Sequence, residues 1–206
     1  MIKVTKSKNK EETDIAMLEA AMAKEPPPLR TLSLFGDLDE ERVQDVCAAL
    51  LYLKHTAFDG QLPDEEPVAQ PIEFFISTWG GDALGMFGIY DLMRMIRETC
   101  DIDTFAIGKV MSAGVLLLAA GTKGKRKIGR NTRIMLHSVR ASHVGGIHSL
   151  ENEMAETRWI QKQHIDALVA ETKMTKKELN NMLNKKVDVY LSAEDAIRLG
   201  IADIIV

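Results

Sequence analysis

The chain has 206 residues, of which 46% are hydrophobic and 27% charged, and it carries a formal net charge of −4 at pH 7. This size and apolar content suit one globular domain with a substantial core. The acidic balance argues against a nucleic-acid binder, which needs a basic face to neutralise phosphates. No apolar run reaches the roughly 18 residues that span a bilayer. We therefore expect neither nucleic acid nor membrane as a partner.

Only 2 cysteines are present, Cys47 and Cys100, and both lie in apolar helical patterns. Such isolated cysteines indicate a reduced interior rather than a disulfide framework, so we expect a cytoplasmic protein. Neither has a partner pattern for zinc, and the histidines have no ligand spacing, so no metal site is expected.

Residues 1–30 are charged and are interrupted near their end by the run Pro26 to Pro28, which predicts a flexible N-terminal arm. The domain itself is predicted over residues 31–206. It opens with a strand at 31–35, a turn at 36–39 and an amphipathic helix. Residues 57–71 are rich in proline and acids and read as a loop or insertion.

Strand patterns then alternate with helix patterns. A strand at 72–76 is followed by Gly80 and Gly81 and a helix capped by Asp82. A strand at 103–108 precedes an apolar helix at 112–120, and a strand at 133–137 follows a short basic run, 123–127, which we expect to be a solvated turn. Repeated βα units predict an α/β fold with a largely parallel sheet.

A long helix is predicted from about His148 to Thr172, on the order of 36 Å at 1.5 Å per residue. Its apolar stripe consists of Leu150, Met154, Ile165 and Leu168. Because such a helix overruns a domain of this size, we expect it to project and to expose this stripe as a contact between subunits. Two capped helices and a short strand complete the chain.

Ser112 is the lone hydroxyl at the start of the apolar helix 112–120. The simplest interpretation is that it only caps the helix. The helix start also offers unpaired N–H groups that would stabilise an oxyanion formed on an atom bonded to this serine.

His137 ends the next strand, and parallel strands bring their carboxyl ends to one edge of a sheet. A serine needs an imidazole to take its proton, and the imidazole needs a carboxylate to orient it. Asp188, which alternates with apolar neighbours in Val187 to Tyr190, is the candidate acid.

At these residues the sequence resembles the proteolytic subunit of the Clp protease, a family of ring-forming serine peptidases. The resemblance covers about residues 31–206 and is densest at 89–93, around Ser112, and at 117–126, 131–137 and 190–205. It implies Ser112 as nucleophile, His137 as general base and Asp188 as orienting acid. The backbone N–H groups of Gly81 and Ala113 would form the oxyanion hole.

The resemblance also implies a Clp-like, crotonase-like fold of βα units with a projecting handle helix at about 148–172. The subunit would be an ATP-independent serine endopeptidase that cleaves unfolded polypeptides or short peptides inside a chamber. Seven-subunit rings, stacked in pairs, would enclose the chamber, and an ATP-dependent AAA+ unfoldase would feed it. No cofactor is expected, because serine, imidazole and oxyanion donors supply the chemistry.

The sequence departs from the family pattern at Trp79, where the family has proline, and at Met111, where it has alanine, so we expect an altered wall of the site. The N-terminal arm and short C-terminus also differ, which concerns the docking of an unfoldase. Two other functions stay open: a non-catalytic ring scaffold, and an acyl-CoA-binding enzyme of the crotonase fold. The remaining histidines are His55, His143, His148 and His164, which we expect to be solvated or interfacial.

Overall fold

The structure is a computed structural model that describes residues 29–59, 66–184 and 187–206. The arm predicted for residues 1–30 lies almost wholly outside the described residues, as does the middle of the 57–71 loop.

The described elements alternate between strand and helix as the sequence predicts. They are β1 (Thr31–Leu38), α2 (Glu40–His55), β2 (Ile72–Gly81), α3 (Ala83–Ile96), β3 (Ile102–Met111), α4 (Ala113–Ala119), β4 (Lys127–Ile128), β5 (Arg133–Leu136), α5 (Ile147–Glu171), α6 (Lys176–Leu183), β6 (Val189–Leu191), α7 (Ala193–Leu199) and β7 (Ile204–Ile205).

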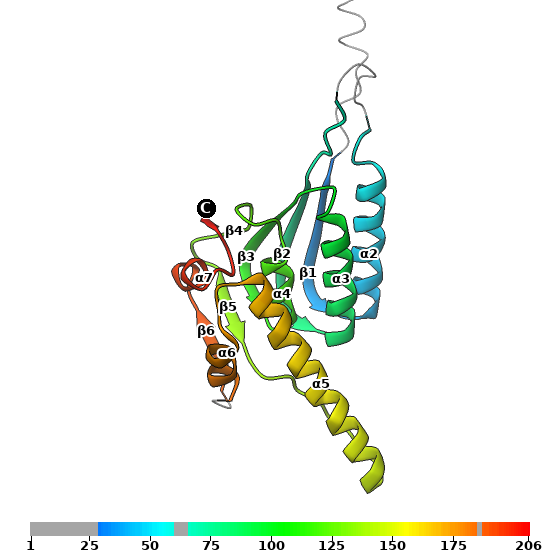
Figure 1. Cartoon of the computed structure of the whole chain (residues 1–206), viewed down its shortest axis with the longest axis vertical. Coiled ribbons are helices and arrows are strands. Elements are labelled where there is room, and N and C mark those ends of the chain that lie inside the picture. The colour runs from blue at the N-terminus through cyan, green and yellow to red at the C-terminus, as the bar shows by residue number, and fades with distance from the viewer. Residues whose placement is uncertain (1–28, 60–65, 185–186) are drawn as a thin grey trace, which may run out of the picture.

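The strands form one sheet in the order β1-β2-β3-β4-β7, with β5 paired to β3 and β6 paired to β5 (Figure 1). Every pairing is parallel except that of β5 with β6. The expectation of an α/β fold with a largely parallel sheet is confirmed.

The predicted turn at residues 36–39 is wrong, because β1 continues through Gly36 to Leu38. Gly36 has a φ of 97°, and the register with β2 shifts between Phe35 and Asp37, which is a bulge. Beyond the bulge, Asp37 and Leu38 pair with Gly80 and Gly81. The bulged end of β1 therefore holds the glycine pair at the end of β2.

The helix α4 is the centre of the core. All seven of its residues are buried, which confirms the prediction of a purely apolar helix after Ser112. It packs on β2 and β3 and also contacts α3 and α5. Its first turn is thereby fixed at the carboxyl edge of the sheet.

The helix α5 lies within one residue of its predicted bounds and extends away from the rest of the domain (Figure 1). Leu150 and Met154 are 39% and 55% exposed, as expected of a projecting stripe. The same expectation is wrong for Ile165 and Leu168, which are 4% and 0% exposed, because the last two turns of α5 pack on the core. None of the described helices is long and apolar enough to cross a membrane.

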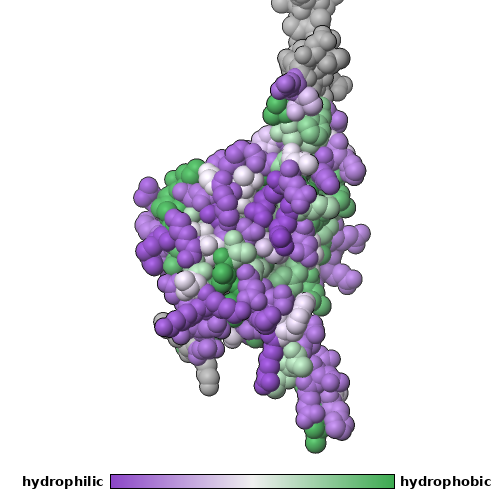
Figure 2. Space-filling model, in the orientation of Figure 1, coloured by the Kyte–Doolittle hydropathy of each residue, from purple (hydrophilic) through white to green (hydrophobic). Residues whose placement is uncertain are grey.

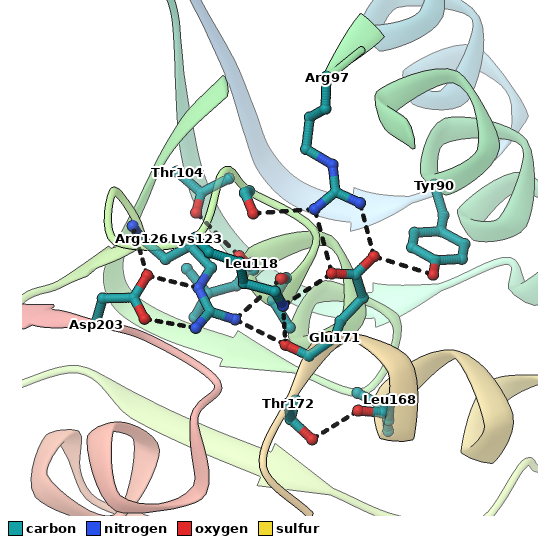
Figure 3. Close-up of polar contacts among 12 residues, drawn as sticks. Tyr90, Arg97, Thr104, Leu118, Lys123, Arg126, Leu168, Glu171, Thr172 and Asp203 are labelled. Atoms are coloured by element: carbon teal, nitrogen blue, oxygen red, sulfur yellow. Dashed lines mark hydrogen bonds and ion pairs between the residues drawn. The ribbon is translucent and has the colours of Figure 1, made fainter. Parts of the chain in front are cut away.

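The carboxyl end of α5 is fixed by the buried carboxylate of Glu171 (Figure 3). Arg97 donates to it at 2.7 and 3.2 Å, Tyr90 at 3.2 Å, and Lys123 forms an ion pair at 2.9 Å. Burial and the neighbouring Glu171 raise the pKa of Tyr90 to about 12, so its hydroxyl stays a donor.

Arg126 extends this network from the turn after α4. Its guanidinium binds both carboxylate oxygens of Asp203 and donates to the backbone carbonyl of Glu171 at 2.8 Å. Because Arg126 is only 3% exposed, the prediction that the run 123–127 is a solvated turn is wrong for this residue. The turn ties α5 to the C-terminal segment.

Glu171→Gln tests the network. Burial alone would raise the pKa of Glu171, but the hydrogen bonds and charges of Arg97 and Lys123 outweigh it and hold the pKa below its ordinary value of 4.5. A carboxylate with a lowered folded-state pKa stabilises above its unfolded pKa, and this contribution is lost as pH falls through the folded value. The variant should lose about 3 kcal/mol at pH 7.

Urea unfolding measures the effect at pH 7 and at several values below 4.5. Wild-type stability should fall more steeply with acid than that of the variant. Glu98→Gln, at an exposed site after α3, is the control and should leave the stability at pH 7 unchanged. Equal acid slopes for wild type and Glu171→Gln would contradict the assignment.

Candidate active site

A cavity of about 600 Å³ lies where β2, β3 and β5 end. One wall comes from the ends of β2 and β3 and the starts of α3 and α4, a second from the segment after β5, and a third from α5. Its lining residues are Trp79, Gly81, Asp82, Ala83, Leu84, Met86, Ser112, Ala113, His137, Val139, Arg140, Ala141, His143, Glu153, Glu156, Thr157, Ile160 and His164.

Ser112 is held in a strained backbone conformation between β3 and α4. Its φ is 54° and its ψ −121°, and among the described residues it alone has a positive φ without being glycine. It occupies the N-cap position, yet its hydroxyl makes no capping hydrogen bond. The interpretation of Ser112 as a simple cap is therefore wrong, since the turn costs on the order of 1–3 kcal/mol and leaves the hydroxyl unused by the helix.

The backbone of Gly80 packs directly against Ser112. A Cβ at position 80 would lie 2.6 Å from the Cβ of Ser112 and 3.1 Å from the nitrogen of Ala113. Gly80 also has a φ of 98°, and its N–H donates to the Thr78 hydroxyl at 2.9 Å. Only glycine fits here, so the glycine turn and the serine turn hold each other in place.

Strand register brings His137 and Asp188 together. The strands β5 and β6 pair antiparallel and their register ends with Leu136 opposite Val189, so His137 and Asp188 are the residues that directly follow β5 and precede β6 at this end. Opposite residues of an antiparallel pair have Cβ atoms about 5 Å apart on one face. The N–H of Ser112 in turn donates to the carbonyl of Met135 at 2.8 Å, two residues before His137.

Ser112 and His137 line the same cavity, whereas Asp188 is not among its lining residues. The ring nitrogen Nδ1 of His137 lies 2.5 Å from the carbonyl oxygen of Ser138, an acceptor, so this nitrogen carries the proton. Asp188 Oδ1 instead accepts from Arg140 Nη2 at 2.5 Å. Within the described ranges, no hydrogen bond joins Ser112, His137 or Asp188 to one another.

The expected oxyanion donors are also at this cavity. Gly81 and Ala113 both line it, and Ala113 is the first residue of α4, where backbone N–H groups lack helical partners. Gly81 has a φ of 147°, and a Cβ there would lie 2.1 Å from the carbonyl oxygen of Leu38. The close approach of β1 therefore requires glycine at this position.

Of the two residues that depart from the family pattern, Trp79 lines the cavity and Met111 does not. Trp79 is 57% exposed at the cavity, with Lys109 Nζ 4.9 Å from the centre of its ring. Met111 is buried at 5% and is not among the lining residues, so the expectation that it alters the wall is wrong. Its side chain alternates away from the cavity along β3.

His164 is a lining residue that the sequence reasoning missed. It was expected to be solvated or interfacial, but it is 5% exposed and its Nε2 has no hydrogen-bond partner among the residues that the structure describes. Burial, and secondarily the charge of His137, lower its pKa to about 4, so it is neutral near pH 7. The sequence does contain a sign of this burial. His164 lies four residues before Leu168, on the same apolar face of α5.

A strained serine at the edge of a parallel sheet, with a histidine at the same cavity and an aspartate at the adjoining end of β6, suits a hydrolase that acts through serine. Comparison with known families narrows this class. The family described as Clp protease matches residues 22–206. The chain belongs to the Clp protease family and is a peptidase subunit of it.

Named relatives match most of the chain. The ATP-dependent Clp protease proteolytic subunit 4 of Rhodococcus jostii is 32% identical over 177 residues, which cover 86% of this chain and 84% of the relative. Proteolytic subunit 2 of Chlamydia trachomatis serovar D is 30% identical, over 84% and 79%. Proteolytic subunit 1 of Corynebacterium glutamicum is 30% identical, over 84% and 77%.

Gly80→Ala should disable peptide cleavage without unfolding the chain. The added methyl must displace Ser112, and a misplacement of about 1 Å costs on the order of 100-fold in rate. Steady-state cleavage of a fluorogenic peptide measures it. Gly88→Ala on α3, where a Cβ meets nothing within 4 Å, is the control and should keep full activity. A fully active Gly80→Ala would refute the close-packing argument.

Proposed function

We propose that the chain is a serine endopeptidase in which Ser112 is the nucleophile, His137 the general base and Asp188 its orienting acid. The observation that supports this is the pairing of β5 with β6, at whose end His137 and Asp188 follow the last paired residues, together with a cavity lined by His137 and the strained Ser112. Unfolded polypeptides and short peptides are the substrates.

The reaction follows from the protonation of His137. With the proton on Nδ1, its Nε2 is free to take the proton of the Ser112 hydroxyl as Oγ attacks the peptide carbonyl. The imidazolium then gives this proton to the leaving amine, which leaves an acyl-enzyme that water hydrolyses by the same route. To stabilise the imidazolium, His137 Nδ1–H moves from the Ser138 carbonyl to Asp188.

Arg140 is compatible with this movement. It holds only Oδ1 of Asp188, so Oδ2 remains to accept from His137. The N–H groups of Gly81 and Ala113 would bind the oxyanion, at a cost of about 100-fold or more in rate when one is lost. This chemistry uses no metal or organic cofactor.

The names of the relatives describe ATP-dependent proteases. Hydrolysis at Ser112 itself uses no ATP, so the nucleotide would be consumed by a separate AAA+ unfoldase that threads polypeptide to this subunit. We assign that partner by analogy with those relatives.

Labelling with a fluorophosphonate probe tests the nucleophile. Wild type should be labelled at Ser112 alone, as located by peptide mapping, and Ser112→Ala should be neither labelled nor active. Asp188→Asn should keep its assembly and lose on the order of 10⁴-fold in kcat, because the imidazole loses its partner. An assembled wild type that is neither labelled nor active would favour the scaffold function.

Assembly is the second part of the proposal. We infer seven-subunit rings stacked in pairs, with α5 as the handle helix between them. Figure 2 shows a mostly hydrophilic surface along the projecting part of α5, with hydrophobic colour at its tip. Val144, three residues before α5, is 100% exposed and Ile147, its first residue, is 74% exposed; Leu150 and Met154 continue this surface. Covering it is worth about 25 cal/mol per Å².

Leu150→Glu with Met154→Glu should therefore split the stacked rings and lower peptidase activity. Native mass spectrometry and light scattering report the assembly, and peptide cleavage reports the activity. Asn152→Glu, which adds one glutamate at an exposed position between the two, is the control and should leave both unchanged. A fully active monomer would contradict the proposed coupling.

A further inference from the structure

Residues 138–145 carry the chain from β5 past the active-site cavity toward α5, and this segment has almost no backbone pairing. Val139 is its only residue whose backbone N–H has a hydrogen-bond partner in the described part of the chain. That partner is a side chain of α5, because the N–H of Val139 donates to Oε1 of Gln161 at 2.6 Å. The segment's other links to the domain are two ion pairs made by its exposed side chains, and such pairs hold a backbone weakly.

Gln161 lies where α5 meets the core. His164, one turn further along, is the first of the buried residues of the helix. The amide nitrogen Nε2 of Gln161 is itself buried, without a hydrogen-bond partner among the described residues. Packing of this kind restricts the side chain, so Oε1 is held in one place as an acceptor.

The N–H that Gln161 binds belongs to the same peptide group as the carbonyl that binds His137. This group joins Ser138 to Val139: its carbonyl oxygen lies 2.5 Å from His137 Nδ1, and its N–H donates to Gln161. A peptide group is planar, so a contact that fixes the N–H also fixes the direction of the C=O. A hydrogen bond at one end also polarises the other, which strengthens the acceptor that His137 meets.

The direction of this carbonyl decides the state of the imidazole. As an acceptor it keeps the proton of neutral His137 on Nδ1, which leaves Nε2 to take the proton of Ser112. Arg140, in the same segment, holds Oδ1 of Asp188 at 2.5 Å. One hydrogen bond to α5 therefore bears on the base and on the cation that binds its orienting acid.

We propose that Gln161 is a positioning residue for peptide cleavage. It holds the peptide group between Ser138 and Val139, and thereby keeps His137 in the orientation and tautomer that leave Nε2 free for the Ser112 hydroxyl. This inference rests on the proposed function, since it takes His137 as the general base. Gln161 does not line the cavity, so it acts through His137 and not through contact with a substrate.

Gln161→Leu tests the inference, because it removes the acceptor and keeps a side chain of similar size. For a fluorogenic peptide, kcat and kcat/KM should both fall about 10-fold with KM unchanged, since the orientation of the base is lost and substrate binding is not. The rate of fluorophosphonate labelling should fall by the same factor, because Ser112 needs its base there too. The kcat is expressed per Ser112 labelled at completion, so that inactive molecules are not counted.

Two further variants complete the test. Gln161→Glu keeps an oxygen acceptor in either protonation state and should restore kcat to within about 3-fold of wild type. Gln163→Leu makes the same substitution two residues along α5, at a side chain without a hydrogen bond to any described residue, and should keep the wild-type kcat. Native mass spectrometry and urea unfolding check assembly and stability, and Gln161→Met replaces Gln161→Leu if leucine prevents assembly.

The outcomes separate this inference from the proposed function. Full kcat in Gln161→Leu overturns the inference alone, as does an equal loss in Gln163→Leu or a Gln161→Glu variant that is as slow as Gln161→Leu. A loss that disappears once kcat is counted per labelled Ser112 assigns Gln161 a purely structural role and also overturns the inference. An assembled wild type that shows neither labelling nor cleavage removes the proposed function, and the inference with it.

Discussion

The site depends on the contact between the backbone of Gly80 and the side chain of Ser112. Two parallel strands, β2 and β3, end side by side, and each ends in a conformation that ordinary residues avoid. Because any Cβ at position 80 would strike Ser112, neither turn can relax without the other. The bulged end of β1 and the Thr78 hydroxyl support the glycine side, and the carbonyl of Met135 supports the serine side.

A second constraint, the buried carboxylate of Glu171, decides where α5 leaves the domain. Tyr90 and Arg97 reach it from α3 and its C-cap, Lys123 reaches it from the turn after α4, and Arg126 binds the backbone at the same point (Figure 3). This anchor lies far from the residues of the proposed chemistry. Because α5 supplies one wall of the cavity, the anchor nevertheless sets the width of the cavity. The paired turns at Gly80 and Ser112 and the anchor at Glu171 together explain how a cavity forms between a sheet edge and a helix that mostly lies outside the core.

The sequence predicts well whatever rests on periodicity and chain order. Alternating βα patterns give the parallel sheet, and the run after Ser112 gives a fully buried helix. It predicts poorly what rests on long-range pairing. Partners distant in the chain determine the bulge at Gly36 and the burial of Arg126. The burial of His164, which keeps its ring neutral, likewise depends on packing against distant residues. The ion pair of Arg140 with Asp188 spans 48 residues, and no local pattern indicates it.

The helix α5 is, mechanically, a cantilever. Its four buried residues all lie between positions 164 and 171, so it is clamped at one end and free at the other. Over the free length of about 26 Å from His164 to Ile147, a rotation of about 5° at the clamp moves the free tip by about 2 Å. Glu156 sits partway along this free length and would move by about 1 Å. Whatever holds the tip therefore adjusts the aperture of the cavity by an amount comparable to the radius of an atom, without touching any residue that takes part in the chemistry.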